Sequence, residues 1–93
     1  MTREEIRAAV MDAIIAVIPE AHREEIDMAT PIRDQLDMDS MDFINFVVEL
    51  DERLGVSVPE SEYGQLQSVE DTVEYLERAL AGSALAGGTE AAR

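Results

Sequence analysis

The sequence predicts an all-α domain, a small bundle of three longer helices and one short helix. Apolar residues recur at helical spacing in three stretches of the 93-residue chain, and each stretch follows a residue type that caps helices. The β-like segment Val56-Ser57-Val58 is too short to build a sheet and has no second strand to pair with. The length leaves room for one domain, and a 46% share of hydrophobic residues is enough for one modest core.

The first helix is expected over residues 3–18. Thr2 and Glu5 have the spacing of a capping box, which places the helix start at Arg3. Pro19 ends the pattern, because its ring clashes with a continuing helix. The apolar face that we expect to be buried consists of Ile6, Val10, Ala13, Ile14 and Val17.

A connector of residues 20–39 follows the first helix. A loop this long is uncommon in a compact domain unless it is functional or has some structure of its own. We expect its isolated apolar residues to pin it to the core; they are Ile26, Met28, Ile32 and Leu36. His22 is the single histidine of the chain, and we expect it at the surface because no chemical partner is in view.

The second long helix is expected to begin at Asp39-Ser40 and to end at Leu54. Asp39 is a good N-cap, Asp42 lies where the helix dipole favours negative charge, and Gly55 is a natural residue after the last turn. Apolar residues fill more than one stripe of this helix, which predicts that it is the central and most buried one.

Proline, glycine and serine positions in the last third of the domain predict one short helical turn and one long helix. The turn follows Pro59 and ends at Gly64, and Ser68 caps a helix that ends at Gly82. We therefore expect a folded domain over residues 1–82 and a flexible tail over residues 83–93.

The charge balance narrows the classes of partner. Acidic residues number 21 and basic residues 7, all of them Arg, for a formal net charge of −14. This balance argues against binding to nucleic acid or to anionic membranes, and it favours basic protein partners or a divalent cation. No stretch resembles a signal peptide or a membrane helix, so we expect a cytoplasmic protein.

An acidic segment around Ser40, residues 36–42, is the strongest candidate for chemistry. The chain has no Cys, which excludes thiolate metal sites and a Cys nucleophile. The spacing fails the calcium-loop pattern, and the glycines of a serine-hydrolase turn are missing, so we predict neither catalytic residues nor a metal site. A hydroxyl at a helix start suits attachment of an anionic group, but the residues alone favour an ordinary first-turn role for Ser40.

Three segments resemble the acyl carrier protein family. They are Asp39-Ser40-Met41, the stretch 43–56, and Val58-Pro59-Glu60. In that family an Asp-Ser-Leu motif opens the second helix, and an acidic stretch leads into an Ile/Val-Pro turn. The last helix, residues 68–80, also resembles the family's last helix, so the resemblance covers about residues 3–81. It implies a four-helix bundle of acyl-carrier type.

The resemblance also implies a function. Ser40, next to Asp39, would bear a 4′-phosphopantetheine group taken from coenzyme A by a phosphopantetheinyl transferase that uses Mg²⁺. The thiol of that group would carry an acyl chain as a thioester, so the protein would be a monomeric carrier and not an enzyme. Residues at the family's recognition positions would meet basic patches on acyl-transferring, condensing or modifying enzymes; these are Met41, Asp42, Glu49, Asp51 and Glu52.

Several departures from the family pattern favour a specialised carrier for a fatty-acid, lipid-modification or polyketide pathway. Met41 replaces the usual Leu, Asn45 replaces a residue that is often acidic, and Arg53 adds a positive charge. Phe43 and Phe46 are bulky, and they either belong to the core or reshape the acyl pocket. Two alternatives stay open: a peptidyl or aminoacyl carrier, and an acidic helical adaptor that is never modified.

Overall fold

The computed structural model describes residues 1–90, and the side chains through residue 82; within this range all regular secondary structure is helical. The elements in chain order are α1 (Arg3–Val17), the 3₁₀ helix η1 (Arg23–Glu25), α2 (Ile32–Gln35), α3 (Ser40–Leu54), the 3₁₀ helix η2 (Glu60–Gln65) and α4 (Val69–Glu90). The prediction of an all-α bundle with three longer helices is confirmed.

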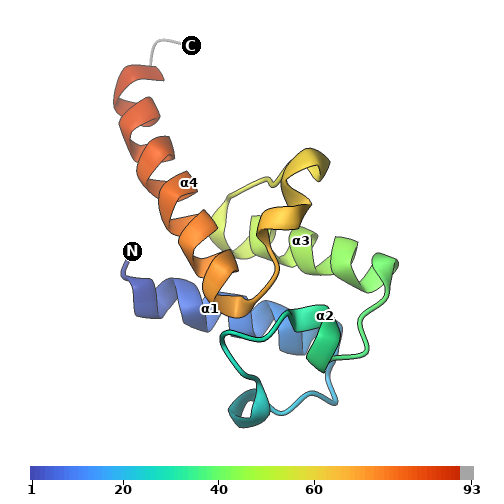
Figure 1. Cartoon of the computed structure of the whole chain (residues 1–93). Coiled ribbons are helices and arrows are strands. Elements are labelled where there is room, and N and C mark those ends of the chain that lie inside the picture. The colour runs from blue at the N-terminus through green and yellow to red at the C-terminus, as the bar shows by residue number, and fades with distance from the viewer. Residues whose placement is uncertain (91–93) are drawn as a thin grey trace.

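Helix α1 is the centre of the bundle, because it packs against both α3 and α4 (Figure 1). Its buried face supplies Ile6, Val10 and Ile14 to the core, as the spacing predicted. The other fully buried large apolar side chains come from the rest of the chain and are Ile32, Phe46, Leu50, Leu66, Val69, Val73 and Leu76. The expectation that the second long helix is the central one is therefore wrong.

The start of α1 has the predicted capping box. The Thr2 hydroxyl accepts a hydrogen bond from the Glu5 backbone N–H at 3.1 Å, and the Glu5 carboxylate accepts one from the Thr2 backbone N–H at 2.7 Å. The Thr2 N–H also holds the pKa of Glu5 below its ordinary value. The helix ends at Val17, one residue earlier than predicted, and Ile18 closes its last turn.

The connector between α1 and α3 has structure of its own, which the sequence did not predict. Its apolar residues are pinned to the core as expected: Ile26 and Ile32 are buried, and Met28 and Leu36 pack against the core cluster. Two backbone hydrogen bonds join the connector to the region around the start of α4. The Ile32 N–H donates to the Gln67 carbonyl at 2.7 Å, and the Glu70 N–H donates to the Met28 carbonyl at 3.0 Å. These contacts hold α2 against the rest of the bundle.

The end of α3 is set by Gly55, which has the left-handed conformation with φ of 71°. The chain then runs extended through buried Val56 and Val58 to η2, which extends one residue beyond the predicted turn. Tyr75 on α4 donates a hydrogen bond to the Glu62 carboxylate and so joins η2 to α4. Burial, strengthened by this hydrogen bond to an anion, raises the pKa of Tyr75 to about 12.

The predicted helix end at Gly82 is wrong, because α4 continues to Glu90 (Figure 1). A glycine inside a helix costs about 1 kcal/mol relative to Ala, but it ends the helix only where it takes the left-handed conformation. Gly82 has no positive φ, and it is surrounded in the sequence by alanines and Leu85, which favour helix. Residues 83–90 of the expected tail are thus helical, and its last residues, 91–93, lie outside the described part of the chain.

Two glycine-to-alanine substitutions should change stability in opposite directions. Gly55→Ala should lower the free energy of unfolding by about 1–2 kcal/mol, because Ala is strained at positive φ. Gly82→Ala should raise it by about 0.5–1 kcal/mol, because a Cβ there meets nothing within 4 Å and the residue is helical. Urea denaturation of both variants measures the two shifts. A loss of stability in Gly82→Ala would contradict the continuation of α4 through this residue.

Candidate functional site

Ser40 is the first residue of α3, and its side chain is exposed. It follows Asp39, whose extended backbone (φ −84°, ψ −176°) makes it the N-cap, as predicted. Met38, the residue before the cap, is buried with 5% of its surface exposed. The chain is therefore anchored in the core two residues before Ser40, and the hydroxyl is presented at a fixed place on the surface.

A second capping box fixes the first turn of α3. One carboxylate oxygen of Asp39 accepts a hydrogen bond from the Asp42 backbone N–H at 2.8 Å, and the Asp42 carboxylate accepts one from the Asp39 backbone N–H at 3.3 Å. Both acids that flank Ser40 are therefore hydrogen-bonded to backbone. Within residues 1–82 no hydrogen bond engages the Ser40 hydroxyl itself.

The start of α3 is chemically suited to a phosphodiester on Ser40. The backbone N–H groups of Ser40 and Met41 lie in the first turn, where a helix offers donors without intrahelical partners and a positive dipole end. The Asp39 and Asp42 carboxylates oppose an anion here, but each one accepts a backbone N–H, which offsets part of its charge. The exposed hydroxyl also leaves room for a modifying enzyme to approach.

The solvent side of α3 carries a stripe of exposed apolar residues. The exposed fractions are 64% for Met41, 44% for Ile44 and 47% for Val48. The sequence predicts burial of this helix from its second apolar stripe. That stripe faces water instead. Sequence reasoning named Met41 as a recognition residue but missed Ile44 and Val48, although their spacing of three and seven residues from Met41 puts all three near one face.

The predicted acidic recognition residues also lie on α3, but they differ in how freely they can meet a partner. The Glu49 carboxylate forms an ion pair with Arg53 at 3.1 Å, and the Asp51 carboxylate accepts a hydrogen bond from the Ser57 hydroxyl at 2.9 Å. Glu52 is exposed and makes no ion pair with any residue in the range 1–82. They are spread along the helix rather than gathered in one cluster.

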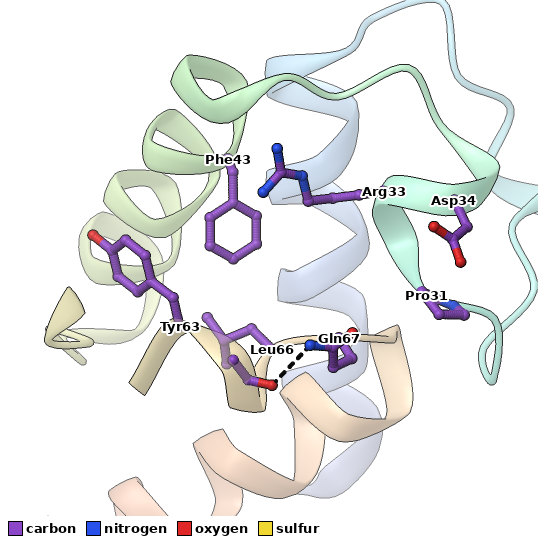
Figure 2. Close-up of a pocket in the computed structure, with 8 residues that line it drawn as sticks. Pro31, Arg33, Asp34, Phe43, Tyr63, Leu66 and Gln67 are labelled. Atoms are coloured by element: carbon purple, nitrogen blue, oxygen red, sulfur yellow. Dashed lines mark hydrogen bonds between the residues drawn. The ribbon is translucent and has the colours of Figure 1, made fainter. Parts of the chain in front are cut away.

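A cavity of about 280 Å³ lies beside the first turn of α3 (Figure 2). Its lining comes from the α2 region, α3, and η2 with the residues after it: Pro31, Arg33, Asp34, Phe43, Tyr63, Gly64, Leu66 and Gln67. Phe43 forms one wall and packs edge-on against Tyr63, with ring centroids 5.4 Å apart. Phe46 is fully buried and does not line the cavity, so the two aromatic residues have different roles.

Other candidate sites receive no support. In the part of the chain that the structure describes, no group of three His, Cys, Asp or Glu residues could hold a metal ion. Asp37, Asp39 and Asp42, although close in sequence, form no such group. None of the helices in the described part has an apolar stretch that could cross a bilayer. His22 is exposed, as expected, and lies at the start of η1.

Comparison with known proteins identifies the class. Residues 9–76 match the family model described as the phosphopantetheine attachment site. The chain is 34% identical to an acyl carrier protein of Campylobacter hominis over 80% of this chain and 87% of that protein. It is 33% identical to an acyl carrier protein of Lactobacillus johnsonii over 82% and 94%. It is also 30% identical to a meromycolate extension acyl carrier protein of Mycobacterium leprae over 84% and 67%.

The fold and these matches define a phosphopantetheine-binding carrier and not an enzyme. The chain belongs to the acyl carrier protein family. Members of this family hold 4′-phosphopantetheine covalently, and they interact with a phosphopantetheinyl transferase and with enzymes that handle acyl groups.

The cap of α3 should be necessary for the geometry around Ser40. Asp39→Ala removes the acceptor for the Asp42 N–H and should lower the free energy of unfolding by about 0.5–2 kcal/mol. Asp39→Asn keeps an acceptor oxygen, and Asn is as good an N-cap as Asp, so its loss should be smaller. Chemical denaturation of the two variants measures the difference, and equal losses would show that the hydrogen bond to Asp42 is not what holds this turn.

Proposed function

We propose that Ser40 is the attachment residue for 4′-phosphopantetheine. The observation that carries this proposal is its exposed hydroxyl at the first position of α3, between two acids whose carboxylates are hydrogen-bonded to backbone. When bound, the group supplies a thiol that holds an acyl chain as a thioester, which a chain without Cys cannot supply itself. Residues 1–82 act as the carrier domain in this proposal, with residues 83–93 as an appendage.

The solvent face of α3 is proposed as the surface that partner enzymes recognise. Met41, Ile44 and Val48 supply apolar area that a partner can cover, and such exposed patches commonly mark interaction sites. Glu52 and the net charge of −14 attract a basic partner surface. Charged pairs of this kind mainly speed association, while the apolar contacts supply affinity.

Three more acids of α3 contribute to this surface, although each one is already bound within the protein; they are Asp42, Glu49 and Asp51. Asp42 belongs to the cap, Glu49 is paired with Arg53, and Asp51 is bound to Ser57. A partner that binds Glu49 through an arginine has to compete with Arg53, which lowers the gain from that contact. We therefore propose Glu52 as the acid that a basic partner meets first.

The pathway is proposed to be a specialised one. Phe43 on a wall of the cavity, Asn45 on the solvent side of α3 and Arg53 near its end all depart from the common pattern of the family. The cargo and partners of such a carrier differ from those of general fatty-acid synthesis, in a lipid-modification or polyketide pathway for example. The alternative of an adaptor that is never modified is disfavoured by the family match over residues 9–76.

Replacing Ser40 by Ala should abolish modification without unfolding the domain. Ala is a good helical residue, and Asp39 rather than Ser40 provides the cap. The purified protein is incubated with coenzyme A, Mg²⁺ and a broad-range phosphopantetheinyl transferase, and the intact mass is measured. Wild type should gain one phosphopantetheinyl group, and Ser40→Ala should gain none. Ser61→Ala, at an exposed serine of η2, is the matched control and should be modified like wild type.

Charge reversal at Glu52 should slow modification more than the same change elsewhere. Glu52→Lys places a repulsive charge on the proposed recognition face, so the transferase kcat/KM should fall about three- to tenfold at low salt. The loss should shrink at high salt, because the Debye length falls from about 10 Å at 0.1 M to about 3 Å at 1 M. Glu24→Lys on η1 makes the same change of charge on another element and should leave the rate near that of wild type.

Equal losses in the two variants would mean that the transferase responds to net charge alone. A rate for Glu52→Lys equal to that of wild type at low salt would contradict the assignment of this face. Melting temperatures of both variants, measured in the same buffers, report whether the fold is unchanged.

A further inference from the structure

Arg33 is held at the edge of the cavity by two contacts. Its Nε–H donates a hydrogen bond to the Met38 backbone carbonyl at 3.3 Å. Its guanidinium carbon lies 5.5 Å from the centroid of the Phe43 ring, in cation–π contact. Figure 2 shows the guanidinium extended toward Phe43, while the Asp34 carboxylate points away from it. The side chain is therefore fixed beside the first turn of α3.

This arginine differs from the others that the structure pairs with acids. Arg3 forms ion pairs with Glu74 and Glu77, Arg23 with Asp12, and Arg53 with Glu49. Arg7 and Arg78 pair with no acid in the range 1–82, but neither of them lines this cavity. Arg33 forms no ion pair with any residue in the range 1–82, although Asp34, Asp37 and Asp39 are near it in sequence.

The cavity beside Arg33 suits a short acyl group with a polar end. Its volume of about 280 Å³ is just below the range of about 300–1,000 Å³ that is typical of small-molecule pockets. Phe43, Tyr63 and Leu66 give it apolar walls, while Arg33 is the single cation of its lining. The Gln67 side-chain amide donates to the Gly64 carbonyl at 3.0 Å, so that polar pair is already satisfied.

The cavity is also within reach of a group attached to Ser40. Phe43 lies three residues after Ser40, which is about 4.5 Å along the helix axis. Residues three apart are neighbours on a helix surface, so an arm on Ser40 starts next to the wall that Phe43 forms. A flexible arm can fold back over this wall and bring its acyl end to the guanidinium.

We propose that Arg33 is a specificity-determining residue that binds a carboxylate at the free end of the acyl cargo, so that this carrier favours short dicarboxylic acyl groups over alkyl chains of the same length. The proposal rests on Ser40 as the attachment residue. The Nη groups of a guanidinium match a carboxylate in a two-pronged hydrogen-bonded pair, and the contact with the Phe43 ring keeps the guanidinium beside the apolar wall of the cavity.

The phosphodiester on Ser40 is a second anion that Arg33 could bind. The experiment therefore separates binding of the cargo carboxylate from binding of the phosphodiester. A transferase that accepts acyl-coenzyme A substrates loads the protein with a free arm, with a pentanoyl arm or with a glutaryl arm. Pentanoyl and glutaryl have the same number of carbons and differ in the terminal carboxylate. Intact mass verifies each loading, and the melting temperature and the Arg33 Nε–H resonance are then measured.

In wild type the glutaryl form should melt at least about 2 °C above the pentanoyl form, a shift within reach of one ion pair in a domain of this size. The Arg33 Nε–H resonance should also move between these two forms. In Arg33→Gln the difference in melting temperature should vanish. Arg53→Gln makes the same change of charge at an arginine already paired with Glu49, and it should keep the wild-type difference.

Equal melting temperatures of the two loaded forms in wild type, with an unmoved Arg33 resonance, would overturn the proposal and leave the carrier function intact. An Arg33-dependent shift that is already complete with the free arm would also overturn it, because the phosphodiester would then be the bound anion. Failure of all loading at Ser40, seen by mass, would overturn the carrier function as well as this inference.

Discussion

The reciprocal hydrogen bonds between Asp39 and Asp42 are the constraint on which the site depends. They fix the first turn of α3, and that turn sets the directions of the residues that follow. Ser40 faces water at its start, while Phe43, in the same turn, faces inward with 6% of its surface exposed. The two bonds satisfy backbone N–H groups that a helix start otherwise leaves without partners, and so they hold the first turn in place. The two acids thus stabilise a helix and define a site in the same step.

Helix α3 can serve two purposes because both of its faces are apolar. The inner face buries Phe43, Phe46, Val47 and Leu50 against the core, and the outer face exposes Met41, Ile44 and Val48. Exposed apolar area costs free energy in the isolated protein, at about 25 cal/mol per Å². In the proposed function, part of that energy is regained each time a partner covers the surface. The acids between these residues keep the free protein soluble and favour only partners of opposite charge.

The sequence predicted those features that local physics decides. The capping box of α1, the Asp39 N-cap, Gly55 after the last turn of α3 and the buried face of α1 follow from residue types at fixed spacing. It mispredicted features that depend on neighbours. Whether a second apolar stripe is buried depends on which helix covers it, and α1 rather than α3 took the central place. Likewise, Gly82 ends a helix only if its backbone turns left-handed, which composition does not determine. The sequence did not indicate a role for Arg33, because its contacts are with Met38 and Phe43, across the turn between α2 and α3.

The separation of the two faces has a consequence for how such a carrier can evolve. In the proposed function, partner choice depends on the outer residues of α3, which are exposed and can change at little cost to stability. In the same proposal, cargo choice depends on the cavity beside Phe43, where a change of volume disturbs packing with Tyr63. Arg33 is an exposed residue of the cavity lining, and its guanidinium carbon lies 5.5 Å from the centroid of the Phe43 ring. A substitution there can alter the charge offered to the cargo without repacking the core. Position 33 is therefore a place at which the charge of the cavity can change with little effect on the core.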